Sequence, residues 1–168
     1  MTRWLARFRV ALGFAFAAVV LRLASPTWWS WALGGAIAVG GEALRVWAAG
    51  HLEKSKEVTR SGPYKFTRHP LYLGSTVLGL GLAVAAHHGM VAVLIVVYLA
   101  ATLTAAMRSE EAHLREKFGD AYDAYAQDRA QPMERRFNWA RARYNREHHA
   151  MAGLAAGLVA LAIKIAVG

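Results

Sequence analysis

The chain has 168 residues, no cysteine, 20 Lys and Arg against 11 Asp and Glu, and a formal net charge of +9. Its length suggests one domain, and the lack of cysteine excludes disulfides, thiolate metal sites and thiol catalysis. Hydrophobic residues make up 56% of the chain and come in long blocks, with the basic residues between them. This pattern is typical of a small membrane protein. The alternation of basic and aromatic residues that would indicate nucleic-acid binding is absent from the sequence.

Five apolar blocks are candidates for membrane-spanning helices. They are Trp4–Ala24, Thr27–Gly50, Leu71–Ala86, Met90–Met107 and Ala150–Val167. A helix needs about 20 apolar residues to cross a bilayer, so the third block is short. Its glycines leave three interpretations open: a tilted helix, a locally thin bilayer, or close packing on a neighbour. The sequence therefore predicts an all-α, polytopic membrane bundle, with residues 1–168 forming a single domain.

The basic residues predict how such a bundle is oriented. Three precede the apolar centre of the first block, which runs from Val10 to Leu21, five lie between the second and third blocks, and nine lie between the fourth and fifth. If five helices alternate in direction, these 17 residues all lie on one side, which the positive-inside rule places in the cytoplasm. The N-terminus and residues 131–149 are then cytoplasmic. His87-His88-Gly89 predicts a tight turn that joins the third and fourth blocks as a hairpin.

Two ionisable residues lie inside the second block. Glu42 and Arg45 are three residues apart and therefore share one helix face. Glu42 lies about 12 Å from the end of this block, and ionisable groups at such depth usually face a cavity or a partner. Two interpretations are open: the pair faces a substrate cavity, or it is an ion pair that locks the packing of helices.

Two further clusters lie at the predicted cytoplasmic ends of the third and fourth blocks. The first is Tyr64, Arg68, His69, Pro70 and Tyr72, and the second is Glu110, Glu111, Leu114, Phe118, Gly119, Tyr122 and Tyr125. Pro70 suits the first turn of a helix, whose free N–H groups and positive dipole end would lie beside the first cluster. Because the hairpin makes the two ends neighbours, we expect Glu110 and Glu111 to lie near His69.

A metal site is not expected at these clusters. Glu110-x-x-His113 has the spacing used in di-iron bundles, but those sites need a second copy, which the chain lacks in any block. The chain also lacks the glycine-rich signatures of soluble nucleotide-binding folds.

The clusters resemble a family of integral membrane enzymes. The matching elements are Leu44-Arg45-x-Trp47-Ala48, Gly62-Pro63-Tyr64, Arg68-His69-Pro70-x-Tyr72-x-Gly74, Glu110-Glu111-x-x-Leu114 and Phe118-Gly119-x-x-Tyr122-x-x-Tyr125. Across residues 40–130 their order and spacing are similar to those of the isoprenylcysteine carboxyl methyltransferase and phospholipid methyltransferase superfamily. The first block and the region after Gln131 show no such likeness.

The resemblance implies a methyltransferase that uses S-adenosyl-L-methionine, held in a cytoplasmic pocket. The cofactor-binding residues it implies are Tyr64, His69, Pro70, Tyr72, Glu110 and Glu111. Arg68, Arg45 and His69 are implied as catalytic residues, with Arg68 between cofactor and acceptor. Glu42, Arg45, Tyr122 and Tyr125 are the residues expected to bind the acceptor.

The methyl acceptor is expected to be lipophilic and to enter from the bilayer. A prenylcysteine-like carboxylate, a lipid amine and a small thiol all suit the superfamily, and Arg45 and Arg68 favour an anionic acceptor. Two alternatives stay open: a membrane reductase that uses a nicotinamide cofactor on a related helical core, and a non-catalytic accessory protein. Gly153-x-x-x-Gly157 in the last block would support helix packing or a homo-oligomer in each case.

Overall fold

The computed structural model describes residues 15–131 and 133–168, and this part of the chain contains helices and no strands. Residues 15–23 are helical, and the further elements are α2 (Trp28–Ala49), the short 3-10 helix η1 (Gly62–Lys65), α3 (Pro70–Ala86), α4 (Gly89–Phe118), α5 (Asp120–Ala126), α6 (Trp139–Tyr144) and α7 (Glu147–Val167). Most of the predicted first span, Trp4–Ala24, lies outside the described residues. The other four predicted blocks each coincide with a helix.

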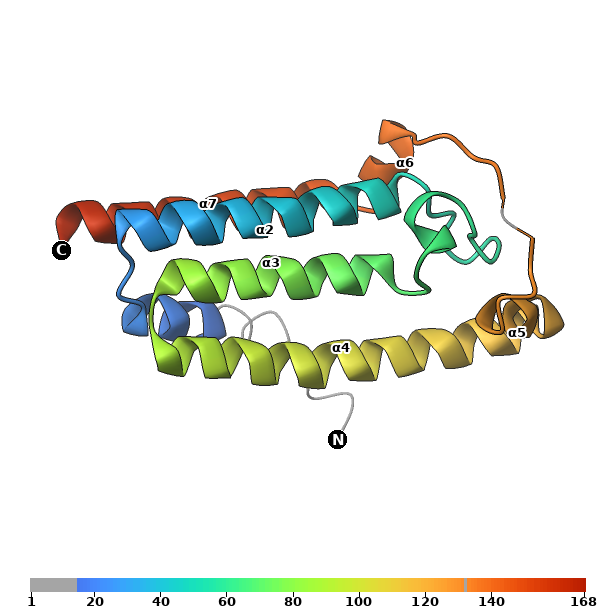
Figure 1. Ribbon diagram of the computed structural model, residues 1–168, viewed down its shortest axis with the longest axis horizontal. Helices are drawn as coiled ribbons and strands as arrows, with labels where there is room; N and C mark the ends of the chain where they lie inside the picture. The colour runs from blue at the N-terminus through green and yellow to red at the C-terminus, as the bar shows by residue number, and fades with distance from the viewer. Residues whose placement is uncertain (1–14, 132) are drawn as a thin grey trace.

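The long helices lie side by side along one axis (Figure 1). Helices α2 and α7 are neighbours, α3 lies against α2, and α4 lies on the far side of α3. Helices η1, α5 and α6 gather at one end of the bundle, which we call the motif end. The turn between α3 and α4 lies at the opposite end, which we call the turn end. The motif end therefore collects the clusters that the sequence singles out.

Glycines let α2 and α3 pack backbone against backbone. Gly34 and Gly41 of α2 face Gly81 and Gly74 of α3, so a Cβ atom on Gly81 would lie 2.7 Å from the carbonyl oxygen of Gly34. No real Cβ contact is that short, and the neighbouring atoms belong to the backbone, which cannot move aside easily. Of the three interpretations of the short third block, the structure therefore shows close packing on a neighbour.

The outer surfaces of the bundle are apolar. Among the described helices, α4 and α7 are long and apolar enough to cross a membrane, and α3 is a shorter apolar helix. The predicted count of five spans is thus not confirmed. Exposed tryptophans lie at both ends of the bundle, with Trp28 and Trp29 at the turn end and Trp139 at the motif end. Aromatic residues at both ends of an apolar surface are typical of a membrane protein.

Helix α4 continues well beyond the apolar block that predicts it. The block ends at Met107, whereas the helix ends at Phe118, where Gly119 adopts φ +47°. No glycine or proline interrupts residues 108–118, so the polar segment continues the helix of the apolar one. The predicted hairpin is confirmed, since α3 ends at Ala86 and α4 begins at Gly89 with a left-handed His87 between them.

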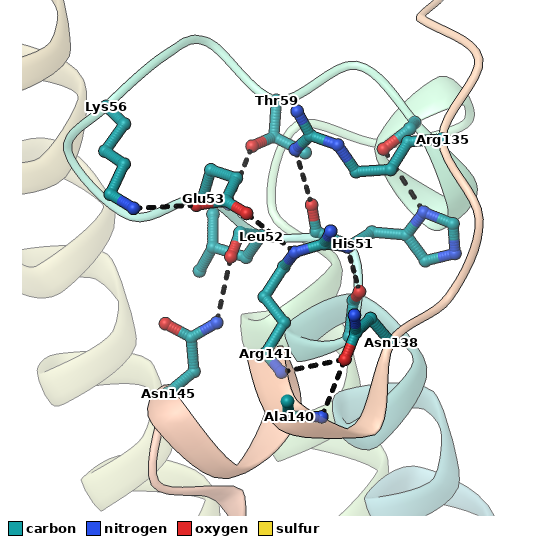
Figure 2. Close-up of polar contacts among 12 residues, drawn as sticks. His51, Leu52, Glu53, Lys56, Thr59, Arg135, Asn138, Ala140, Arg141 and Asn145 are labelled. Atoms are coloured by element: carbon teal, nitrogen blue, oxygen red, sulfur yellow. Dashed lines mark hydrogen bonds and ion pairs between the residues drawn. The ribbon is translucent and has the colours of Figure 1, made fainter.

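A polar network at the motif end attaches the segment before α7 to the end of α2 (Figure 2). The last carbonyl groups of a helix have no partner within the helix. Here Arg141 donates to the Gly50 carbonyl at 2.6 Å, Arg135 to the His51 carbonyl at 3.1 Å, and Asn145 to the carbonyls of Ala49 and Leu52 at 2.9 and 3.0 Å. Positive side chains at this end also oppose the negative end of the helix dipole.

The same network includes carboxylates. Arg141 pairs with Glu53 at 2.8 Å, and Arg135 makes two bonds to Glu57 at 2.6 and 2.8 Å. The network holds residues 135–145 in place, and α7 begins only two residues later, at Glu147. It therefore sets where α7 starts relative to α2.

His51 makes the stability of this network depend on pH. Burial, followed by the nearby cations Arg141 and Arg135, lowers the pKa of His51 below its usual value of about 6.5. The unfolded chain then binds a proton at higher pH than the folded chain, so this contribution to stability falls as pH drops through about 6.5.

Replacing His51 with glutamine tests this assignment. We expect the melting temperature of His51→Gln to change less between pH 7.5 and 5.5 than that of the wild-type protein. The exposed control His113→Gln should keep the wild-type slope, and equal slopes in all three proteins would contradict the assignment.

Candidate functional site

The first part of the site lies at the motif end, between the start of α3 and the polar part of α4. His69 Nε2 lies 2.8 Å from Glu111 Oε1, and Arg68 lies 3.7 Å from the same oxygen. The hydrogen bond from His69, with the positive charge of Arg68, holds the pKa of Glu111 below its usual range. Glu111 lies beside His69 and Arg68, as the hairpin predicts. It is an ionised acceptor, and its partners already occupy one of its two oxygens.

Three tyrosines lie on η1 and α5, at the same end of the bundle. The Tyr125 hydroxyl donates to the Tyr64 carbonyl at 2.9 Å, and the Tyr122 ring packs edge-on against Tyr125. Tyr122 is fully buried, yet its hydroxyl has no hydrogen-bond partner among the described residues. An unpaired buried hydroxyl is costly, and such groups commonly mark a place where a ligand or water binds.

Tyr64 links this cluster to the interior of the bundle. Burial raises the pKa of its hydroxyl, and the negative charges of Glu110 and Glu147 raise it further. Glu110 belongs to the polar part of α4, whereas Glu147 opens α7. The Tyr64 carbonyl accepts the hydrogen bond from Tyr125 of α5, and η1, which carries Tyr64, packs against α2. Tyr64 therefore connects the polar cluster to the helix that carries Arg45.

Helix α3 begins at the centre of the first cluster. Pro70 occupies its first turn, as predicted, and no side chain among the described residues caps the helix. Its free N–H groups and positive dipole end thus lie beside His69. A pocket of about 460 Å³ between α3 and α4 is lined at this end by Thr67, His69 and Tyr72. Towards the turn end the pocket wall is mostly aliphatic.

The second part of the site is centred on Arg45. Its guanidinium makes two hydrogen bonds to Glu147, at 2.9 and 3.0 Å, and a third to the Ser75 hydroxyl. Glu42 lies 3.4 Å from Arg45 Nε, which supports the ion-pair interpretation of these two residues. Arg45 thus bridges three helices, α2, α3 and α7. Sequence reasoning missed Glu147 and Ser75, since no local pattern links either residue to Arg45.

Arg45 also lies at one end of an apolar cavity of about 510 Å³. The wall comes from the helix of residues 15–23 and from α3, α4 and α7, with Ser75 beside Arg45 at the polar end. Among the described residues of this lining, Arg45 is the only charged one. The cavity therefore combines a long apolar wall with one polar end that lies towards the motif end.

The predicted site residues thus fall into three places. Tyr64, Arg68, His69, Pro70, Tyr72, Glu110, Glu111, Tyr122 and Tyr125 gather at the motif end, and Arg45 lines the apolar cavity. Glu42 lines neither of these; its side chain faces a groove between α2 and α7, beside Trp47 and Met151. The structure therefore separates the four residues expected to bind the acceptor: Tyr122 and Tyr125 lie with the cofactor cluster, and only Arg45 lies on the cavity.

These features define a class of protein: a helical membrane protein with a polar cluster at one end of an internal apolar cavity. The family model of phospholipid methyltransferases matches residues 9–121, about two thirds of the chain. The protein therefore belongs to the phospholipid methyltransferase family, which confirms the superfamily resemblance. No curated protein and no solved structure shows a significant match to the chain.

Proposed function

We propose that this protein transfers a methyl group from S-adenosyl-L-methionine to the polar head of a lipid held in the apolar cavity. The observation that carries the proposal is the arrangement of the two parts of the site, which are connected through η1 and its residue Tyr64. The polar cluster suits a charged, water-soluble cofactor, and the cavity suits an apolar chain. Membership of a methyltransferase family supports the type of reaction.

The residues present fit the cofactor. The ionised Glu111 can accept hydrogen bonds from a ribose diol or an ammonium group, and the free N–H groups at the start of α3 can bind a carboxylate. The buried, unpaired Tyr122 hydroxyl supplies a further polar contact, and tyrosine rings can pack against an adenine or a cationic sulfonium. When bound, the cofactor supplies an electrophilic methyl group on its sulfonium.

The charges around the cavity bear on the nature of the acceptor. The expectation of an anionic acceptor relied on the positive charges of Arg45 and Arg68. Both are now paired: Arg45 lies between Glu42 and Glu147, and Arg68 lies beside Glu111. Because carboxylates already pair with both arginines, these charges no longer favour an anionic acceptor, and a lipid amine fits the cavity as well as a carboxylate.

An amine acceptor has to lose a proton before it can attack the methyl group. His69 and Glu110 are the bases that we propose for this step, and Glu111 orients the His69 ring through the 2.8 Å hydrogen bond. Arg45 acts as a positioning residue at the polar end of the cavity. The remaining requirement is alignment of the two reactants in a site that excludes water.

We also propose the topology that follows from the charge distribution. Five spans, with the N-terminus and the motif end in the cytoplasm, place 17 of the 20 basic residues on the cytoplasmic side. The cofactor then reaches its site from the cytoplasm, and the lipid reaches the cavity from the bilayer.

Calorimetry of the detergent-purified protein tests the cofactor. We expect S-adenosylhomocysteine to bind and NADPH not to bind. Binding of NADPH alone would favour the reductase, and binding of neither ligand at millimolar concentration would favour a non-catalytic accessory protein. Methylation of a lipid extract with labelled cofactor, followed by identification of the product, tests the acceptor.

Glu111→Gln tests the proposed cofactor site. The substitution keeps the shape of the side chain but removes its charge, so we expect the affinity for S-adenosylhomocysteine to fall about tenfold or more, as for loss of one charge-assisted hydrogen bond. The matched control is Glu116→Gln, an exposed residue on the same helix. Equal affinities of the two variants would place the cofactor elsewhere.

A further inference from the structure

The cavity has the length of a lipid chain from one leaflet. Its α7 wall runs from Ala150, near the Arg45 end, to Leu161 near the turn end. Eleven residues of helix cover about 16 Å, and the α3 wall from Ser75 to Ala86 has the same extent. Half of the hydrocarbon core of a bilayer is about 15 Å thick. A chain whose head lies beside Arg45 would therefore reach the turn end of the cavity.

Two glycines of α7 lie along this wall. Gly153 and Gly157 both line the cavity, and a Cβ atom on either would meet no described atom within 4 Å. They differ in this from the glycines between α2 and α3, where a Cβ atom would collide with backbone. Gly153 and Gly157 therefore bring no helix of the described chain closer to α7. Their effect among the described residues is to leave space, and within this part of the chain they do not support the packing of one helix on another.

We infer that Gly153 and Gly157 set the length of the hydrocarbon chain that the enzyme accepts. This inference rests on the proposed function, because it assumes that the acceptor lipid places its chain in this cavity. Gly157 lies about 10 Å along α7 from Ala150, and Gly153 lies about 5 Å from it. A side chain at residue 157 would thus block only the deep part of the cavity, whereas one at residue 153 would block the part near the head.

The position of these glycines in the chain supports a role in specificity. Residues 9–121 match the family model, and α7 lies beyond this region. The family region supplies Arg45 and most of the polar cluster, including Tyr64, His69 and Glu111, whereas α7 completes the wall around the acceptor chain. A helix outside the matched region can therefore vary the acceptor without altering the proposed cofactor site.

Leucine substitutions along the wall test the inference. The probes are single-chain phosphoethanolamines with 6 or 16 carbons, since an extended chain advances about 3.6 Å for every three bonds and the shorter chain spans roughly 7 Å. Affinities for both probes and for S-adenosylhomocysteine are measured in a steroid-based detergent. The matched control is Gly40→Leu, because Gly40 is also helical and open but lies outside the cavity lining.

We expect Gly157→Leu to weaken binding of the 16-carbon probe at least tenfold and to change binding of the 6-carbon probe less than twofold. Gly153→Leu should weaken both probes, Gly157→Ala should give an intermediate loss for the long probe, and Gly40→Leu should change neither. Unchanged S-adenosylhomocysteine affinity shows that each variant is folded.

The inference is overturned if Gly157→Leu changes the affinities for the two probes by the same factor. It is also overturned if the wild-type protein binds S-adenosylhomocysteine but not the long probe. Failure of the proposed function looks different, since the wild-type protein would then bind no S-adenosylhomocysteine at all.

Discussion

Replacing Arg45 with methionine is expected to destabilise the folded protein by about 3–5 kcal/mol, because the change leaves two carboxylates without their positive partner. Glu147 and Glu42 are both buried, and Arg45 is the residue that the structure pairs with each of them. The measurement is equilibrium unfolding in mixed micelles. A second variant that combines Arg45→Met with Glu147→Gln should regain part of the lost stability, since one uncompensated charge is removed.

The control for this prediction is Arg115→Met. Arg115 pairs with Asp123 at 2.9 Å, but both side chains are exposed, so its loss should cost less than about 1 kcal/mol. If Arg45→Met instead keeps full stability and lowers only turnover, Arg45 acts on the acceptor and does not hold the helices. Such a result would favour the interpretation in which Glu42 and Arg45 face a substrate cavity.

Gly81→Val is expected to lower the free energy of unfolding by about 3 kcal/mol or more, a value at or beyond the upper end for overpacked cores. A Cβ atom on Gly81 would meet the backbone of Ala38 and Gly34, so the substitution forces α2 and α3 apart along their length. The measurement is again equilibrium unfolding, together with the yield of folded protein. Gly40→Val is the control, since a Cβ atom there meets nothing within 4 Å. Similar stabilities of the two variants would show that the helices are free to separate.

Local sequence features were enough to predict the helices and the polar cluster. Apolar blocks bounded by Pro70, His87 and Gly50 predict α2, α3 and the start of α4 to within a few residues, because hydrophobic runs and turn residues act over short distances. The hairpin then predicts that Glu111 meets His69, 42 residues away, because a two-residue turn makes the two helices antiparallel neighbours.

Long-range pairing could not be predicted in this way. Glu147 lies 102 residues from Arg45, in a segment whose composition suggests only a basic loop. Its position depends on the network that ties Arg141, Asn145 and Arg135 to the end of α2, and each of those contacts is itself tertiary. The fourth block, predicted as a span, ends at Met107, whereas helix α4 continues to Phe118. Hydropathy reports where a helix leaves the apolar region, whereas backbone propensity decides where the helix stops.

The length, composition and charge of this protein already determined its class. The chain has 56% hydrophobic residues in blocks, and 17 of its 20 basic residues lie at the N-terminus or between blocks. Both features fit a helical membrane protein, because backbone polar groups in lipid must be paired within each segment. The motif residues determined the family. Only the tertiary structure decided the remaining roles, because the effect of a charged residue or a glycine depends on the atoms that surround it. Arg45 is held between two carboxylates, and the glycines of α7 open a cavity instead of closing a contact.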